Sequence, residues 1–338
     1  MRKFEARLFY TPPTEALRYL PECPRLLSNS GVPEPWLGWV AIVHEPGGAG
    51  GSLNILHLDT LENRSIDLPG RPGFFSETDE PGVVVVGLDR RLALVNIHTG
   101  QVEETGLSVC DDERVVINDG FAIPGGLLFG TKHLEFNQPI AALYHFEEST
   151  GTLREAIPGQ YCSNGKHYWT ESDGSVHLVD TDSIPRAITH YVFEDASLRK
   201  VIRQAPLTPA DKLPSIPDGC RNDANGETIL VAYFNTELVA DGIAQQLRID
   251  TGEAVAEWRI PGSPRVTCPE IFEWNGKVVV LFTSATEGMT PEHRAVAPHA
   301  GCFYIADTSL DRAPAPPPLI SAASLRGSSA HRPSSSAL

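Results

Sequence analysis

The chain lacks the paired cysteines that hold zinc or carry out disulfide exchange. Its 338 residues include six cysteines, at positions 23, 110, 162, 220, 268 and 302, and no two of them form a C-x-x-C pair. This spacing excludes a zinc knuckle and a thioredoxin-like redox pair. We therefore expect the cysteines to act as small buried hydrophobic side chains in a reducing compartment.

Long apolar runs and an excess of positive charge are also absent. No segment approaches the ~18 apolar residues of a membrane span, and residues 1–7 carry positive charge without the apolar stretch of a signal peptide. The net charge is −16, and such a surface repels nucleic-acid phosphates and anionic lipids. We predict a cytoplasmic protein, monomeric or weakly homo-oligomeric, with no nucleic-acid or membrane partner.

Several catalytic motifs are missing as well. The sequence contains no G-x-S-x-G nucleophile elbow, no H-E-x-x-H zinc helix and no G-K-[ST] phosphate loop. The chemistry that each of these three motifs supports is therefore not indicated.

Short β-rich runs separated by Gly, Pro, Asn and Asp fill most of the chain, while long helical periodicity is hard to find. Examples are residues 39–45 (WVAIVHE), 82–88 (GVVVVGL), 91–97 (RLALVNI) and 228–234 (TILVAYF). This spacing of strands and turns indicates an all-β protein.

A weak repeat refines that prediction, because six segments each place a short alternating strand before an acidic or polar turn. The turns lie near Asp59, His98, Glu147, Glu194, Asp250 and Asp307. Their intervals, 39 to 57 residues, are around the ~40–50 residues of a four-stranded propeller blade. We predict a six-bladed β-propeller with four-stranded blades over residues 1–312, with a β-sandwich array as the rival architecture. Residues 313–338, rich in Pro, Ser and Ala, are predicted to be a disordered tail.

A second periodicity lies in Asn118-Asp119-Gly120, Asn164-Gly165 and Asp218-Gly219. The residues Asp119, Asn164 and Asp218 are 45 and 54 positions apart, in step with the blades. Equivalent positions on the innermost strands of a propeller converge on its axis, so their oxygen atoms can meet in a ligand cage. The alternative interpretation is that these are tight turns, where Asn-Gly and Asp-Gly are common.

At these motifs the sequence resembles the family that joins senescence marker protein (regucalcin), gluconolactonase and luciferin-regenerating enzyme. The resemblance covers about residues 20–310. Its motifs are NDG at 118–120 with GT at 130–131, CSNG at 162–165, IPDG at 216–219, and RVTC at 265–268 before FTSA at 282–285. They occur in the family's order and at its approximate spacing.

The resemblance implies a divalent metal ion held by a Glu, an Asn and an Asp, which correspond to Glu22, Asn164 and Asp218. Glu34 is a rival for the first ligand, but it leaves too few residues for an inner strand before the strand at 39–45. The family's Glu-Gly-Pro motif reads Glu22-Cys23-Pro24 here, so a glycine has become a cysteine. Two carboxylates and one amide oxygen suit Ca²⁺ first, with Mg²⁺, Mn²⁺ and Zn²⁺ as alternatives.

Three protein ligands leave coordination positions open for water and substrate, as a catalytic ion requires. The implied activity is a metal-dependent lactonase that hydrolyses a sugar-acid, gluconolactone-like lactone, with Asp218 as the base as well as a ligand. The alternative is a metal-binding propeller with a regulatory or protein-interaction role and little turnover.

The resemblance also suggests the residues that contact the small-molecule lactone. Asn118, Asp119 and Glu135 fall where family members have substrate-binding side chains. Two residues before the Asn, regucalcin-like members carry an Arg that helps to hold the sugar, and here that residue is Val116. The loss of this cation leaves fewer hydrogen bonds for a polyhydroxylated lactone.

Overall fold

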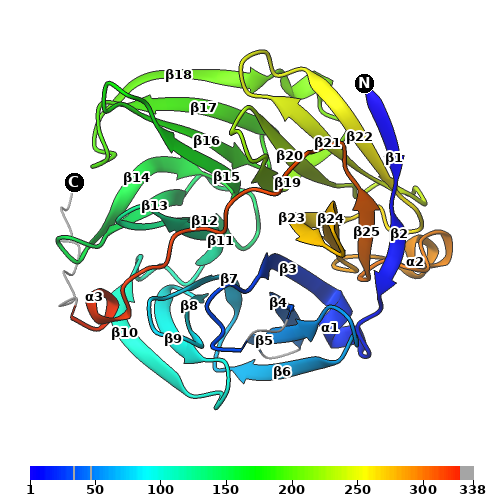
Figure 1. The fold of residues 1–338 in the computed structure, drawn as a ribbon, viewed down its shortest axis with the longest axis horizontal. Helices are drawn as coiled ribbons and strands as arrows, with labels where there is room; N and C mark the ends of the chain where they lie inside the picture. Colours follow the sequence, from blue (N-terminus) through cyan, green and yellow to red (C-terminus); the bar gives the residue numbers. More distant parts are fainter. Residues whose placement is uncertain (33–34, 46–47, 328–338) are drawn as a thin grey trace.

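Six antiparallel sheets stand around a central axis in the computed structural model, which describes residues 1–32, 35–45 and 48–327 (Figure 1). Within these residues each sheet is a blade of four strands, and one sheet carries a fifth. The prediction of a six-bladed β-propeller with four-stranded blades is confirmed. We number the blades I to VI in the order of their innermost strands.

The innermost strands surround the axis. They are β3 (Leu20–Leu26), β7 (Pro72–Glu77), β11 (Val115–Ile123), β15 (Ser163–Thr170), β19 (Ile216–Asn222) and β23 (Val266–Trp274). The second strands are β4 (Trp36–Glu45), β8 (Val83–Leu88), β12 (Gly126–His133), β16 (Val176–Asp182), β20 (Thr228–Phe234) and β24 (Lys277–Ser284).

The third strands are β5 (Gly48–His57), β9 (Arg91–Asn96), β13 (Ala141–Glu147), β17 (Ala187–Phe193), β21 (Gly242–Arg248) and β25 (Phe303–Asp307). The outer strands of blades I to V are β6 (Asn63–Leu68), β10 (Val102–Ser108), β14 (Thr152–Gln160), β18 (Val201–Thr208) and β22 (Ala254–Ile260). Each turn of the predicted repeat directly follows or ends a third strand, so the repeat marks the same place in all six blades.

Burial explains why the strands differ in sequence pattern. The second strands lie between neighbouring blades, so both of their faces are covered, and every residue of β12 (GLLFGTKH) is buried. The outer strand β10 alternates between buried and exposed positions, as a strand with one solvated face should. The hydrophobic core therefore lies between the blades.

The last blade is completed by the N-terminal end of the chain. Strand β2 (Arg7–Tyr10) pairs with β25 as the outer strand of blade VI, with Arg7 opposite Ile305. Strand β1 (Arg2–Glu5) adds in parallel to β22 at the outer edge of blade V. The ring is thus closed by hydrogen bonds between the two ends of the propeller sequence.

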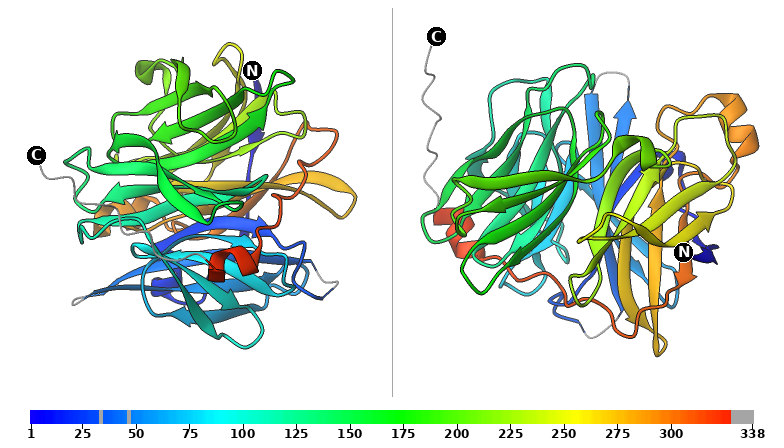
Figure 2. Two further views of the ribbon diagram at one scale, coloured as in Figure 1. Left: turned by 90° about the vertical axis from the view of Figure 1, so that its left-hand side faces the viewer. Right: turned by 90° about the horizontal axis from the view of Figure 1, so that it is seen from above.

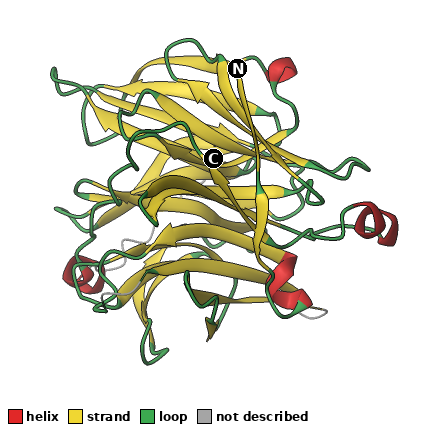
Figure 3. Cartoon of the chain, turned by 45° about the vertical axis from the view of Figure 1, so that its right-hand side comes forward, coloured by secondary structure: helices red, strands yellow, loops and turns green. Residues whose placement is uncertain are grey.

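Helices are few and short in the described residues, and they lie at the periphery (Figure 3). They are α1 (Glu15–Tyr19), α2 (Pro291–Val296), α3 (Ala322–Gly327) and the 3-10 turn η1 (Ala210–Lys212). None of the helices in this part of the chain has the length and apolarity that crossing a membrane would need.

The prediction of a disordered tail from residue 313 differs from the structure up to residue 327. The segment after β25 crosses the face of the propeller and ends in α3 beside blade II (Figures 1 and 2). Ile320 forms a parallel bridge with Thr78, and Ile320 and Leu325 are almost fully buried in the core of blades I to III. These apolar side chains anchor a segment whose overall composition is typical of disorder. Residues 328–338 lie outside the described residues.

Candidate functional site

Every innermost strand has an irregular register with its neighbour near its start. The shifts lie between Glu22 and Arg25, Pro72 and Phe75, Ile117 and Gly120, Asn164 and Lys166, Pro217 and Cys220, and Val266 and Pro269. A β-bulge bends a strand and redirects its side chains. The motifs at 118–120, 164–165 and 218–219 all fall within these bulges, so the fold redirects their side chains at equivalent places.

The inner strands approach one another closely at the bulges, which explains a glycine after the metal-ligand candidate Asn164. A Cβ on Gly165 would lie 2.7 Å from the carbonyl oxygen of Asp218 and 2.6 Å from the backbone nitrogen of Cys220. Only a residue without a side chain lets β15 and β19 come this near. The glycine is therefore required by packing between blades IV and V.

Four of the sequence-predicted residues line one cavity of about 190 Å³ on the inner strands. They are Glu22 on β3, Asn118 on β11, Asn164 on β15 and Asp218 on β19. Glu22, Asn164 and Asp218 are each within the first three residues of their strand. The structure thus brings together side chains from four blades.

A chain of hydrogen bonds orients the two amide side chains. Asn118 Nδ2 donates to Asn164 Oδ1 at 3.0 Å and to the Ser163 carbonyl at 3.1 Å. Asn164 Nδ2 donates to Ser183 Oγ at 2.8 Å, and this hydroxyl donates to the Pro217 carbonyl at 2.7 Å. The amide nitrogen of Asn164 is therefore engaged by Ser183. The amide oxygen accepts from Asn118 and is the atom of this side chain that remains for a ligand in the cavity.

The carboxyl groups of Glu22 and Asp218, which both line the cavity, repel each other when both are charged. Burial, followed by the charge of Asp218, raises the pKa of Glu22 well above its ordinary value. Burial also raises the pKa of Asp218, Lys132 opposes that rise, and Asp119 adds to it. A cation placed between the two carboxylates would offset both the burial and the mutual repulsion.

The donor set fits a hard divalent cation. Two carboxylates and an amide oxygen face one small cavity, and such oxygen ligands are those of Ca²⁺ and Mg²⁺. Among the described residues, no group of three or more His, Cys, Asp and Glu side chains is arranged to hold a metal. The predicted ligand set of Glu22, Asn164 and Asp218 contains only two residues of these types, because its third member is an asparagine.

The cysteine that replaces a family glycine adopts a backbone conformation that normally favours glycine. Cys23 has φ 50°, in the left-handed region, and is 1 % exposed. Its thiol donates to the Phe75 carbonyl at 3.8 Å. A residue with a side chain thus occupies a left-handed conformation next to Glu22, at a conformational cost of about 1 kcal/mol.

Other predicted residues lie away from the cavity. Asp119 is not among its lining residues, although its charge helps to raise the pKa of both Glu22 and Asp218. Glu135 does not line the cavity either: it is exposed and accepts a hydrogen bond from Asn137 at 3.0 Å. Strand β12 ends at His133, and Glu135 lies in the loop beyond it. Glu34 lies outside the described residues.

Two charged lining residues had no motif to mark them, Lys132 and Glu287. Lys132 is the direct partner of Val116 in the ladder of β11 and β12. Directly opposite residues of antiparallel strands share one face of the sheet. The cation that is absent at position 116 is therefore present on the same face, supplied by the neighbouring strand. The sequence signal that could have identified Lys132 is a charged residue at the end of the largely apolar run GLLFGT.

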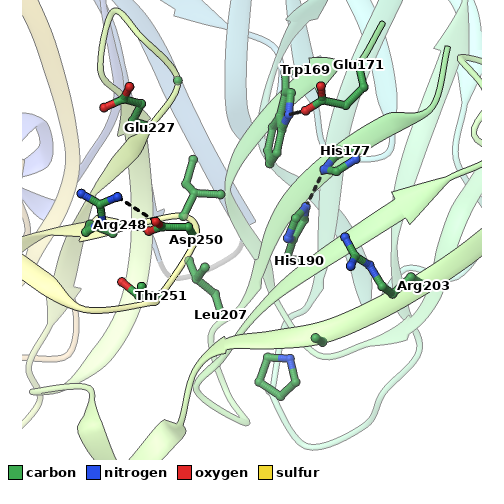
Figure 4. Close-up of a pocket in the computed structure, with 14 residues that line it drawn as sticks. Trp169, Glu171, His177, His190, Arg203, Leu207, Glu227, Arg248, Asp250 and Thr251 are labelled. Carbon is green, nitrogen blue, oxygen red and sulfur yellow. Dashed lines mark hydrogen bonds and ion pairs between the residues drawn. The ribbon is translucent and has the colours of Figure 1, made fainter. Parts of the chain in front are cut away.

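A larger cavity, of about 740 Å³, lies between blades IV and V outside the ring of inner strands (Figure 4). Several of its polar side chains pair with one another. Trp169 Nε1 donates to Glu171 at 2.9 Å, His177 Nδ1 and His190 Nε2 lie 3.0 Å apart, and Arg248 forms an ion pair with its neighbour Asp250. We assign the candidate site to the smaller cavity, because Glu22, Asn164 and Asp218 line it from three different blades.

Comparisons with known proteins agree with this fold. The model of the SMP-30/gluconolactonase/LRE-like region matches residues 35–284. A Bacillus subtilis (strain 168) protein named as a sugar lactone lactonase is 25 % identical over 271 residues, which are 80 % of this chain and 86 % of the relative. The L-arabinolactonase of Azospirillum brasilense is 24 % identical over 71 % of this chain and 76 % of its own.

Among solved structures, the calcium-binding protein regucalcin of Agrobacterium tumefaciens superposes with a TM-score of 0.74. It is 18 % identical and the match covers 93 % of this chain and 98 % of regucalcin. At that identity the likeness shows the fold, while the matched region of the family model exceeds half of the sequence. The chain belongs to the SMP-30/gluconolactonase/LRE-like family.

Proposed function

We propose that the protein is a metal-dependent lactonase that hydrolyses a sugar-acid lactone, gluconolactone-like, in the cavity at the inner strands. The observation that supports this most directly is the meeting of Glu22, Asn118, Asn164 and Asp218, from four blades, at one small cavity. The names of the relatives, a sugar lactone lactonase and an L-arabinolactonase, point to the same reaction.

Glu22, Asn164 and Asp218 would hold the divalent cation, Ca²⁺ in the first instance. When bound, such an ion polarises an ester carbonyl and lowers the pKa of water. The chain's own residues do the remaining work. Ser183 holds the Asn164 amide so that its oxygen faces the ligand, and Asn118 donates hydrogen bonds at the rim of the same cavity.

In the reaction, water adds to the lactone carbonyl carbon and the ring C–O bond breaks, which leaves a hydroxy acid. An Asp218 carboxylate oxygen accepts the proton of the attacking water, and the ring oxygen takes up a proton as it leaves. Asp119 and Glu135 are not assigned a part in this reaction, because neither lines the cavity.

The test is a pH-drop assay on a panel of aldonolactones and uronolactones. The protein is first stripped with EDTA and then given Ca²⁺, Mg²⁺, Mn²⁺ or Zn²⁺. We expect a metal-dependent rate that Asp218→Asn lowers by at least about 100-fold. Asp211→Asn, an exposed carboxylate on η1, is the matched control and should keep the rate.

If no lactone responds with any metal, or if Asp218→Asn keeps the wild-type rate, the proposed activity is wrong. Calcium binding without turnover would instead favour a metal-binding propeller with a regulatory or protein-interaction role.

A further inference from the structure

The cavity contains a buried cation that the proposed reaction does not use. Among the described residues that line it, Lys132 is the sole basic side chain. Lys132 is 5 % exposed and is the second-last residue of β12, directly after the Gly130-Thr131 motif. Its ammonium group therefore has the cavity as its route to solvent.

Lys132 forms no ion pair within the described part of the chain, although the charges of Glu287 and Glu22 act on it. Its ammonium group lies over the ring of Phe136, with Nζ 5.4 Å from the ring centroid. Both Lys132 and Phe136 line the cavity. Three N–H donors are thus available to a ligand.

The surroundings of Lys132 favour an anion. Burial lowers the pKa of Lys132, and the positive charge of Arg71 lowers it further. Arg71 is itself 2 % exposed, and its Nε and Nη2 atoms have no hydrogen-bond partner in the described residues. Glu287 offsets part of this positive charge. A buried ammonium without an ion pair is costly, so a carboxylate that enters the cavity would relieve that cost.

We propose that Lys132 binds a carboxylate of the substrate, so that the cavity selects lactones with a free carboxylate, the monolactones of sugar diacids, over neutral lactones. The inference rests on the proposed function: once Glu22 and Asp218 hold a divalent cation, Lys132 is the basic side chain among the described lining residues that can bind an anionic group of the substrate. An ammonium–carboxylate contact is charge-assisted, which makes it stronger than a contact with a hydroxyl.

The test compares glucarolactone, which keeps a carboxylate, with gluconolactone, which does not. We expect wild-type kcat/KM to be at least about 10-fold higher on glucarolactone, because a charge-assisted contact is worth about 1.5–3 kcal/mol. Lys132→Met, similar in shape and uncharged, should lower the ratio of the two kcat/KM values about 10- to 100-fold. Lys132→Arg should keep most of the ratio, and Lys212→Met, an exposed lysine on η1, should keep all of it.

A second measurement does not depend on turnover. Isothermal titration of the two hydrolysis products, glucarate and gluconate, should show tighter binding of glucarate to wild type and a loss of that difference in Lys132→Met. If catalysis is absent but glucarate still binds more tightly through Lys132, the proposed activity fails and the inference stands. If neither the kinetic ratio nor the binding difference changes in the folded Lys132→Met protein, the inference is wrong.

Discussion

A buried ion triad near the axis gives a prediction whose size follows from the structure. Glu270 on β23 pairs with Arg25 of β3 at 3.2 Å and with Arg221 of β19 at 3.1 Å. The side chains are 4 %, 10 % and 8 % exposed, respectively. The triad joins blades I, V and VI, and one carboxylate balances two guanidinium groups.

Glu270→Gln keeps the shape of the side chain and removes its charge, which leaves two buried arginines without a counter-ion. Removal of one partner from a buried pair costs about 3–5 kcal/mol. The unfolding entropy of a chain of this length is about 0.7 kcal/mol per kelvin, so a loss of about 4 kcal/mol should lower Tm by about 6 °C. Differential scanning calorimetry measures the shift.

The matched control is Glu104→Gln, which breaks a surface pair. Glu104 lies 3.4 Å from Arg91, with side chains 64 % and 40 % exposed. An exposed pair contributes about 0–1 kcal/mol, so this Tm should fall by less than about 2 °C. If Glu270→Gln lowers Tm no more than Glu104→Gln does, the reasoning that burial sets the cost is refuted.

Three further predictions concern packing and pH. Leu325→Ala in α3 should cost about 2–4 kcal/mol in a urea titration, since Leu325 is fully buried, whereas the exposed Leu319→Ala should change little. Gly165→Ala should lower Tm and weaken Ca²⁺ binding in a calorimetric titration, because its Cβ would displace the Asp218 backbone; unchanged binding would contradict this. Burial, with the charge of a neighbouring arginine, lowers the pKa of His145 to about 4. The unfolded chain therefore takes up the proton first, so stability should fall from pH 6.5 toward pH 4, and His145→Gln should flatten that fall in Tm.

The number of blades could be predicted because each blade repeats one local event. The third strand of each blade ends at a polar turn, as at Asp59 and Asp250. Such turns can be recognised from the local sequence, without information on distant contacts. The closing strand was not predicted, because residues 7–10 are short and partly exposed and become a strand through pairing with β25. Local patterns therefore indicate the blades, while the closure depends on tertiary contact.

The residues of the candidate site also fall into two groups, those that local sequence could place and those that depend on tertiary packing. Asn164 and Asp218 could be placed from sequence because both occupy the bulge of an innermost strand, which the blade period locates. Lys132 and Glu287 could not, since their approach to the cavity depends on how the second strands and loops pack above the inner ring. Glu135 does not line the cavity and accepts a hydrogen bond from Asn137 in the loop after β12, so its substrate contact stays a prediction.

The pairing of β2 with β25 also has a consequence for how the molecule forms. Residues such as Arg7 and Ile305, almost 300 positions apart, must find each other before blade VI has its fourth strand. Contacts this distant in sequence carry a large loop-closure entropy and slow a folding reaction. We expect the ring to seal late in refolding, after blades I to V have largely assembled, and until then the third strand of blade VI presents an open edge to other chains.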